Sequence, residues 1–250
     1  MSGPAILQVE SLAKSFGGVQ AVAGVSFHVL PGEMVALIGP NGAGKSTCFN
    51  MLNGQLRPDA GRVRVAGAEI TGLAPRHVWR LGVGRTFQIT ATFGSMTVRE
   101  NVQMALLSHH RELRRFWRAA RERHRPAADA LLARVGLGEQ ADRAAAVLAY
   151  GDLKRLELAI SLAHAPRLLL MDEPTAGMGP GERIELMALT ERIARASGMA
   201  VLFTEHDMDV VFGHADRVLV LDGGRLIAEG EPDHVRADPR VREVYLGSRA

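Results

Sequence analysis

The pattern of apolar and polar positions predicts short buried strands that alternate with helices. Three apolar runs of strand length are continuous, at residues 34–38, 168–171 and 199–203, and the last predicts a strand that ends at Thr204. Continuous runs of this kind are typical of parallel strands that are covered on both faces. Helices are predicted at residues 47–52, 75–79, 153–165, 181–197 and 208–214. This alternation favours an α/β fold with a mainly parallel central sheet.

Other segments have the features of antiparallel hairpins and of a helical insert. Alternation and glycine-marked turns predict strand segments at residues 6–10, 25–29, 61–70 and 217–229. Two helices are predicted within residues 103–135, and Pro126 is expected to separate them. One final helix is predicted at residues 236–246. The chain is therefore expected to combine a parallel core with an antiparallel part and a helical part.

Composition narrows the class of protein. The chain has 250 residues, of which 47% are hydrophobic and 23% are charged, as in ordinary folded domains. No apolar stretch approaches the roughly 18 residues that a membrane-spanning helix needs. The first residues lack the pattern of a secretory signal, and the only cysteine, Cys48, cannot form an internal disulfide. These features lead us to expect a folded protein of a reducing cytoplasm.

Arginine supplies nearly all of the positive charge, and one group of arginines lies close together in the predicted helical insert. The formal net charge is +3 and the sequence pI is about 9.5. Several arginines crowd residues 111–125. They could form a solvated face, contact anionic lipid headgroups, or contact nucleic-acid phosphates. The solvated face is the favoured interpretation, and a contact with the membrane comes second. Nucleic-acid binding is disfavoured, because outside this segment the arginines are not interleaved with aromatic residues.

The stretch GPNGAGKST, residues 39–47, lies between a predicted strand and a predicted helix. It matches the phosphate-loop pattern, in which backbone N–H groups and a helix N-terminus bind phosphates. A lysine reaches the β- and γ-phosphates, and the following hydroxyl binds Mg²⁺. A plain glycine-rich turn is the alternative. The predicted nucleotide-binding residues are Gly39, Pro40, Asn41, Gly42, Ala43, Gly44, Lys45, Ser46 and Thr47.

A second chemical signal is the phrase RLLLMDEP, residues 167–174, where a buried strand ends in two carboxylates. Asp172 is predicted to bind Mg²⁺ together with Ser46, and Glu173 to polarise the attacking water. Helix-capping acids are the alternative interpretation. His206 follows the next buried strand, so a contact with the same phosphate is expected.

Three further features are ambiguous from the residues alone. Phe16 could stack on a nucleotide base or pack in a core. The phrase VLAYGD, residues 147–152, opens a helix with a glycine, which suits a phosphate or a plain turn. Gln88 carries no chemical signal by itself.

Taken in order, these motifs make the whole chain resemble the ATP-binding subunit of an ABC transporter. The phrases GVGRTFQ, MTVRENV, AYGDLKRLE and DEPTAGMGP most resemble the subunits of branched-chain amino acid importers. The resemblance implies a P-loop NTPase core with a mixed, mainly parallel sheet, an antiparallel β subdomain and an α-helical subdomain. The implied division is 1–87 with 166–230 for the core, 88–165 for the helical subdomain, and 231–250 for a helical tail.

The resemblance also implies a mechanism that uses ATP and Mg²⁺. Two such subunits close head to tail, so that each ATP lies between the 39–47 loop of one subunit and a second conserved-pattern segment of the other, the signature, which usually reads LSGGQ. Phe16 then stacks on the base, Gln88 senses Mg²⁺ and the attacking water, Glu173 is the general base, and His206 contacts the γ-phosphate. The signature corresponds to Leu148, Ala149, Tyr150, Gly151 and Asp152.

The implied partners are membrane-spanning permease subunits, a second ABC ATPase subunit in a homodimer or heterodimer, and indirectly an external solute-binding protein. The implied location is peripheral, on the cytoplasmic face of the cell membrane. Rival readings are an ATPase for another small polar solute such as urea or an amide, a soluble ABC ATPase acting on DNA or the ribosome, and a regulator that does not hydrolyse ATP. No nucleic-acid partner is expected.

The sequence departs from the common family pattern at the signature and after the acidic strand. Ala149 stands where serine is usual, Tyr150 replaces a glycine, and Asp152 replaces glutamine. The segment after the acidic strand usually reads SALD in this family, but residues 176–179 read Ala-Gly-Met-Gly, so the aspartate that contacts the opposite subunit is absent. Backbone donors near Gly151 are therefore expected to carry more of the contact with the opposite ATP. Weak basal hydrolysis is expected to follow.

Overall fold

The computed structural model describes residues 4–86, 92–110, 112 and 123–246. These residues form two compact units. The first unit comprises residues 1–85, 167–174 and 194–250, and the second comprises 86–166 and 175–193. The domain boundaries inferred from the sequence stay a prediction.

A mixed six-stranded sheet has the order β10-β9-β3-β8-β7-β6. Strands β7, β8, β3 and β9 are parallel neighbours, and β10 is antiparallel to β9. The strands are β3 Met34–Ile38, β6 Val83–Thr86, β7 Leu168–Asp172, β8 Ala200–Thr204, β9 Arg217–Asp222 and β10 Arg225–Gly230. Every residue of β3, β7 and β8 is buried, as the continuous apolar runs predicted.

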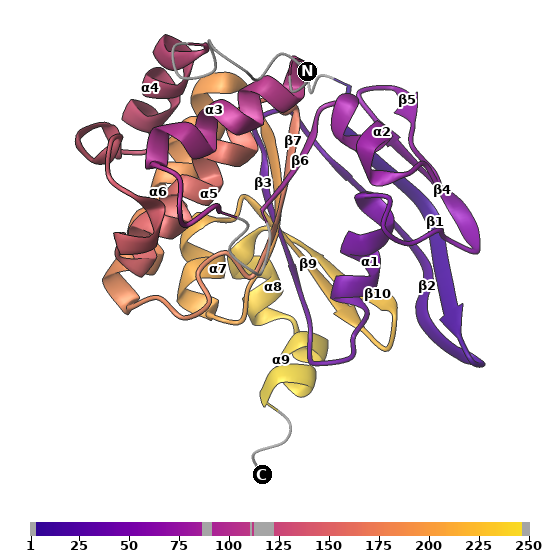
Figure 1. Cartoon of the computed structure of the whole chain (residues 1–250). Helices are drawn as coiled ribbons and strands as arrows, with labels where there is room; N and C mark the ends of the chain where they lie inside the picture. The colour runs from indigo at the N-terminus through magenta and orange to yellow at the C-terminus, as the bar shows by residue number, and fades with distance from the viewer. Residues whose placement is uncertain (1–3, 87–91, 111, 113–122, 247–250) are drawn as a thin grey trace. The chain divides into compact units, whose positions relative to one another are not determined.

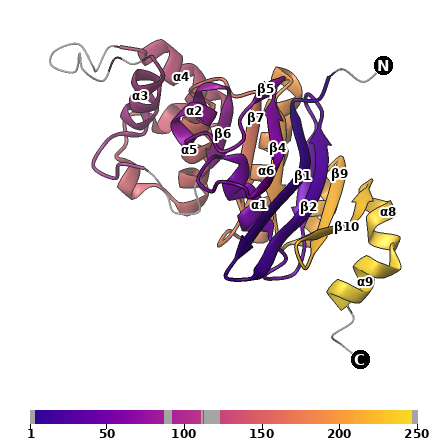
Figure 2. The ribbon, with the colours of Figure 1, turned by 90° about the vertical axis from the view of Figure 1, so that its right-hand side faces the viewer.

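A second, antiparallel sheet has the order β2-β1-β4-β5 (Figure 2). Its strands are β1 Leu7–Phe16, β2 Val19–Val29, β4 Ala60–Val65 and β5 Ala68–Glu69. β1 and β2 are longer than predicted, because their ends pair with each other around the glycine turn at 17–18 while their side chains are exposed. Exposed ends of this kind lack the apolar alternation by which the strands were recognised.

The core of the first unit lies between these two sheets and is filled by α1 Lys45–Leu52 (Figure 1). Alternate residues of the parallel strands point into it, including Val35 and Leu37 of β3 and Leu168 and Leu170 of β7. Cys48, Phe49, Met51 and Leu52 of α1 are almost fully buried in the same cluster. The helix that follows the phosphate loop is therefore held rigidly by apolar burial.

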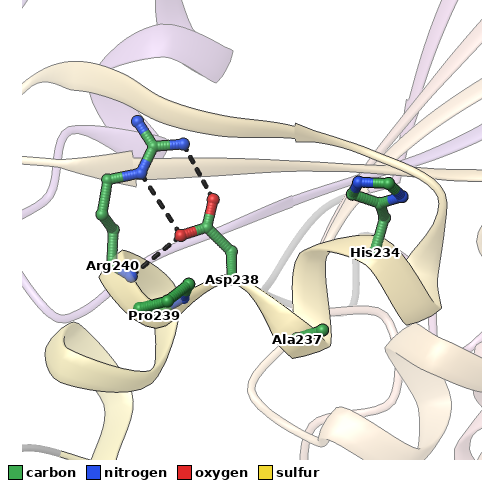
Figure 3. Close-up of a pocket in the computed structure, with 5 residues that line it drawn as sticks. All are labelled: His234, Ala237, Asp238, Pro239 and Arg240. Atoms are coloured by element: carbon green, nitrogen blue, oxygen red, sulfur yellow. Dashed lines mark hydrogen bonds and ion pairs between the residues drawn. The ribbon is translucent and has the colours of Figure 1, made fainter.

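The remaining helices of the first unit are short. They are α2 Pro75–Arg80, α7 Met208–His214, α8 Pro232–Ala237 and α9 Pro239–Leu246. The single final helix predicted at 236–246 is wrong, because Pro239 lacks an N–H and disfavours helical backbone at Asp238. Figure 3 shows the break, where the Arg240 guanidinium donates two hydrogen bonds to the Asp238 carboxylate.

The second unit contains α3 Val98–His109, α4 Arg125–Arg134, α5 Tyr150–Leu162 and most of α6 Pro180–Ser197. Two short 3₁₀ turns, Gly138–Gln140 and Ala145–Val147, precede α5. Helices α3, α4 and α5 pack against one another.

The first helix of the insert was misplaced by the sequence analysis. It was expected to begin at residue 103 and to run towards Pro126, but α3 begins at Val98 and ends at His109. Thr97 and Glu100 form a capping box, in which each side chain accepts from the other's backbone N–H. The pattern T-x-x-E was visible in the sequence and identifies this helix start.

We predict that Thr97→Ala destabilises the protein by about 1 kcal/mol, because the substitution leaves the Glu100 N–H without its cap. Urea unfolding of the two proteins measures the difference. The matched control is Ser108→Ala, at an exposed position in the last turn of the same helix. Equal unfolding midpoints for Thr97→Ala and the unsubstituted protein would contradict the capping role.

Candidate functional site

The 39–47 loop requires glycine at two positions for reasons of space. Gly39 and Gly44 have φ of 155° and 104°. A Cβ on Gly39 would lie 2.2 Å from the carbonyl oxygen of Leu221, and one on Gly44 would lie 2.3 Å from that of Ala21. Strands β9 and β2 thus press on the loop from the same unit. Its backbone conformation is consequently fixed by the fold.

Lys45 is the first residue of α1, and its side chain contacts the loop before it. Its ammonium group donates hydrogen bonds to the carbonyl oxygens of Gly39 at 2.6 Å and Pro40 at 3.0 Å. Burial lowers the pKa of Lys45, while the nearby carboxylates of Glu173 and Asp172 oppose that shift. These contributions place the cation in the same electrostatic environment as both acids.

The start of α1 has backbone donors available for a ligand. Gly44 is the N-cap residue and supplies no side-chain cap, and the first turn of α1 contains no acidic residue. Ser46 is exposed in that turn. A helix N-terminus with these properties suits an anion such as a phosphate.

The carboxylate of Asp172 is buried, and both of its oxygens have protein partners. Thr204 donates its hydroxyl to Oδ1 at 2.8 Å, and Arg85 donates from Nη2 to Oδ2 at 3.3 Å. The Arg85 guanidinium also donates to Asn50 and Gln55. Burial lowers the pKa of Arg85, and Asp172 opposes that shift. The position of Asp172 is thus fixed by β8 on one side and by β6 on the other.

Glu173 adopts a left-handed backbone conformation, with φ of 49°. Such a conformation is costly for a residue with a side chain and is frequent at functional sites. Two hydrogen bonds hold it, because the Glu173 N–H donates to both the carbonyl oxygen and the hydroxyl of Thr204 at 3.1 Å. Glu173 Oε1 lies 3.0 Å from Nε2 of His206. Two predicted catalytic residues are therefore in direct contact.

The structure also locates Phe16 at the end of β1, next to the glycine turn. Its side chain is 49% exposed, which removes the alternative of a core aromatic and leaves a ring face accessible. The Lys14 ammonium group lies 5.6 Å from the ring centroid. Gln88 lies outside the described residues.

The predicted signature lies at the beginning of α5 in the second unit. Ala149 is the N-cap residue, with no side-chain cap, and Leu148 before it is buried. Asp152, in the first turn, accepts a hydrogen bond from the Gln140 amide at 2.8 Å. The helix begins three residues earlier than predicted, so Tyr150 and Gly151 are helical residues. The first backbone N–H groups have no side-chain cap, as in α1, but the first turn of α5 contains the acidic Asp152.

The comparisons with known proteins all find ATP-binding proteins of ABC transporters, and the similar proteins match almost the whole chain. A family model described as ABC transporter matches residues 22–176, and one described as branched-chain amino acid ATP-binding cassette transporter matches residues 225–250. The chain is 41% identical to the high-affinity branched-chain amino acid transport ATP-binding protein BraF of Pseudomonas aeruginosa, over 99% of both chains. It is 39% identical to LivG of Escherichia coli K12, a protein of the same description, again over 99% of both.

A solved structure agrees as well. The ADP conformation of MJ1267, an ATP-binding cassette of an ABC transporter, matches with a TM-score of 0.87 and 33% identity, over 98% of this chain and 100% of that one. The chain belongs to the ABC transporter family of ATP-binding proteins. The ABC ATPase fold and ATP hydrolysis expected from the sequence are thereby confirmed. The roles of individual residues in this ABC ATPase stay predictions.

Sequence reasoning missed two residues that contact the predicted site residues, Thr204 and Arg85. Thr204 could have been found, because it is the last residue of a buried strand next to the strand that ends at Asp172. Parallel neighbours bring their carboxyl ends together, and Asp172 is the register partner of Thr204. Arg85 gives no comparable signal, because an arginine in a short strand is usually an exposed residue.

Other features of the described residues do not mark a second site. No helix among them is long and apolar enough to cross a membrane. No group of three or more His, Cys, Asp or Glu side chains among the residues described is arranged to hold a metal ion. An open hollow is lined by His234, Ala237, Asp238, Pro239 and Arg240 (Figure 3). It contains none of the predicted site residues.

We predict that Thr204→Val lowers ATP turnover by about tenfold. The substitution removes the hydroxyl that orients Asp172 and accepts from the Glu173 N–H, and misplaced catalytic groups lose rate steeply. It also leaves a buried carboxylate oxygen without its donor, which destabilises the protein by about 1–3 kcal/mol. Steady-state ATPase assays and urea unfolding measure the two effects.

The matched control is Thr190→Val, which removes another buried threonine hydroxyl, one bonded to the carbonyl oxygen of Leu186. Its turnover is expected to equal that of the unsubstituted protein. If the two variants lose equal turnover, Thr204 has no special connection with Asp172 and Glu173.

Proposed function

We propose that this protein is the ATP-binding subunit of an importer for branched-chain amino acids. The observation that carries the choice of solute is the match of residues 225–250 to the family model specific for branched-chain amino acid cassettes. That segment contains β10, α8 and α9, which lie outside the ATP-binding motifs. The high identity to BraF and LivG supports the same choice.

Within this function, Glu173 is the general base for the water that attacks the γ-phosphate. Its contact with His206 supports the assignment, because a histidine can hold a carboxylate in position and also donate to a phosphate oxygen. The left-handed backbone of Glu173 is locked by Thr204, so the carboxylate is preorganised before ATP binds. Lys45, within the electrostatic reach of both acids, neutralises charge on the transferred phosphoryl group.

Mg²⁺ is the expected metal of this reaction, and the residues present fit it. The Ser46 hydroxyl and the Asp172 carboxylate are hard oxygen donors, the kind that Mg²⁺ prefers. Mg²⁺ sites at nucleotides use one or two carboxylates together with phosphates and waters, so the absence of a larger cluster of ligands among the described residues is compatible with the ion. When bound, the ion neutralises charge on the β- and γ-phosphates. Gln88 completes this proposed set.

The start of α5 supplies the contact with the ATP of a second subunit. Ala149 has no donor in its side chain, so the contact rests on the backbone N–H groups of the first turn, near Gly151. These groups have no side-chain cap to compete with a phosphate. Phe16, with its exposed ring, is assigned to the base of the subunit's own ATP.

The cassette works as a pair, either with itself or with a related ATPase subunit, and it is attached to permease subunits on the cytoplasmic face of the membrane. An external solute-binding protein delivers the solute to those permeases. ATP binding closes the pair and hydrolysis reopens it, which changes the side of the membrane to which the permease opens.

We predict that Glu173→Gln reduces steady-state ATP hydrolysis by at least about 10²-fold while ATP still binds, because the amide cannot accept the proton of the attacking water. The same variant should accumulate as a dimer when ATP is present, since the closed pair cannot be released by hydrolysis. Turnover and light scattering in ATP measure these effects. Glu69→Gln, at an exposed site in β5, is the matched control. Undiminished turnover in Glu173→Gln would remove the proposed general base.

The choice of solute is tested by coexpressing the protein with its permease subunits and reconstituting the purified complex in proteoliposomes. The binding protein is added outside the vesicles. Import of radiolabelled leucine or valine, dependent on internal ATP, is the expected result. Glu173→Gln in the same vesicles is the control for leakage. ATP-dependent import of urea or a short amide, with no import of branched-chain amino acids, would contradict the proposed solute and favour the rival small polar solute.

A further inference from the structure

The tyrosine that replaces the first signature glycine has a specific contact within the second unit. The Tyr150 hydroxyl donates to the carbonyl oxygen of Ala176 at 3.0 Å. Its ring lies against Gly177, where an added Cβ would be 3.4 Å from both the ring Cε1 and the hydroxyl oxygen. Although 44% of the side chain is exposed, both its polar end and its ring edge are therefore engaged.

Lys154 restrains the same ring. Its ammonium group lies 5.5 Å from the ring centroid, within the range of a cation–π contact. Lys154 is only 6% exposed, and it is paired with Glu157 at 3.1 Å in the same helix. A buried, paired cation has little freedom to move. The ring is thus held by α5 as well as by Gly177.

A second connection joins the same two segments. Glu182, in the first turn of α6, accepts a hydrogen bond from the Gly179 N–H at Oε2, at 3.1 Å. Its other oxygen, Oε1, would lie 3.0 Å from a Cβ added to Gly151. The carboxylate thus packs directly on the first turn of α5 while it holds the end of the 176–179 segment. Both ends of that segment are attached to the signature.

The 176–179 segment is connected to the proposed catalytic carboxylate, Glu173, by the covalent chain. Ala176 follows Glu173 by three residues, so a displacement of the 176–179 segment is transmitted to the backbone after Glu173. We propose that Tyr150 is a positioning residue, which fastens the 176–179 segment to the signature so that engagement of α5 by the ATP of a second subunit also sets the backbone after Glu173. The inference rests on the proposed roles of α5 and Glu173.

The test compares Tyr150→Phe and Tyr150→Ala with the unsubstituted protein in two assays. Hydrogen exchange detected by mass spectrometry follows the amides of residues 176–179 without nucleotide. Loss of the hydroxyl contact in Tyr150→Phe should speed their exchange by about fivefold, the effect of one net hydrogen bond. Tyr150→Ala, which also removes the ring, should show a larger increase. Ile184→Ala, at an exposed apolar position on α6, is the matched control and should leave the exchange unchanged.

The second assay is steady-state ATP hydrolysis. Both Tyr150 variants should have kcat lowered by about tenfold, with little change in KM for ATP, because the binding loop lies in the other unit. Unchanged exchange in both variants, or faster exchange with unchanged kcat, would overturn the positioning role. The proposed function is judged separately, by ATP hydrolysis in the unsubstituted protein and its loss in Glu173→Gln. If that test succeeds while both Tyr150 variants keep the exchange and the kcat of the unsubstituted protein, this inference alone is refuted.

Discussion

The register between β7 and β8 is the constraint on which the arrangement of Asp172 and Glu173 depends. Asp172 and Thr204 are partners in adjacent parallel strands. That register lets one threonine hydroxyl donate to the Asp172 carboxylate while it accepts from the N–H of Glu173. A left-handed residue directly after a buried strand is otherwise unfavourable, and these two bonds make it stable. A shift of one residue would remove both contacts and point the acidic side chains to the opposite face.

The phosphate loop depends on the same sheet by a different route. Its helix α1 is buried among alternate residues of the parallel strands, and its glycines are pressed by the carbonyl groups of Leu221 and Ala21. Apolar burial fixes where the helix begins, and close backbone approach fixes the shape of the loop before it. Lys45 and the two acids are then brought near one another without any direct pairing between them among the described contacts. The result is a preorganised polar site on an apolar support.

Much of this arrangement could be predicted from the sequence because its strongest signals are local. The continuous apolar runs identified β3, β7 and β8. The motif at 39–47 was correctly predicted to join a strand to a helix. The predictions failed where the decisive interaction was a side-chain bond or a single proline. Because of the capping box at Thr97, α3 begins at Val98 and not at the predicted residue 103. Because of Pro239, the segment predicted as one final helix contains the end of α8 and a separate α9. Arg85 was not foreseen, because its role depends on Asn50 and Gln55, at the end of α1, and on the distant Asp172.

The signature shows a different limit of sequence reasoning. Comparison with the common family pattern identified Tyr150 as a departure, but the pattern alone described what had been lost. The contacts with Ala176 and Gly177 show what the new side chain does in this chain. The second unit therefore carries its own means of joining the signature to the segment after the catalytic strand, built from one aromatic residue and one carboxylate.

The most direct measurement of the central claim is a crystal structure of the Glu173→Gln variant with ATP and Mg²⁺. The account predicts ATP phosphates on the 39–47 loop, the ion beside Ser46 and Asp172, and the γ-phosphate near residue 173. It further predicts the first turn of α5 from a second subunit on the opposite side of the same γ-phosphate. A structure with ATP bound elsewhere, or with its γ-phosphate remote from both residue 173 and any α5 N-terminus, would contradict the account.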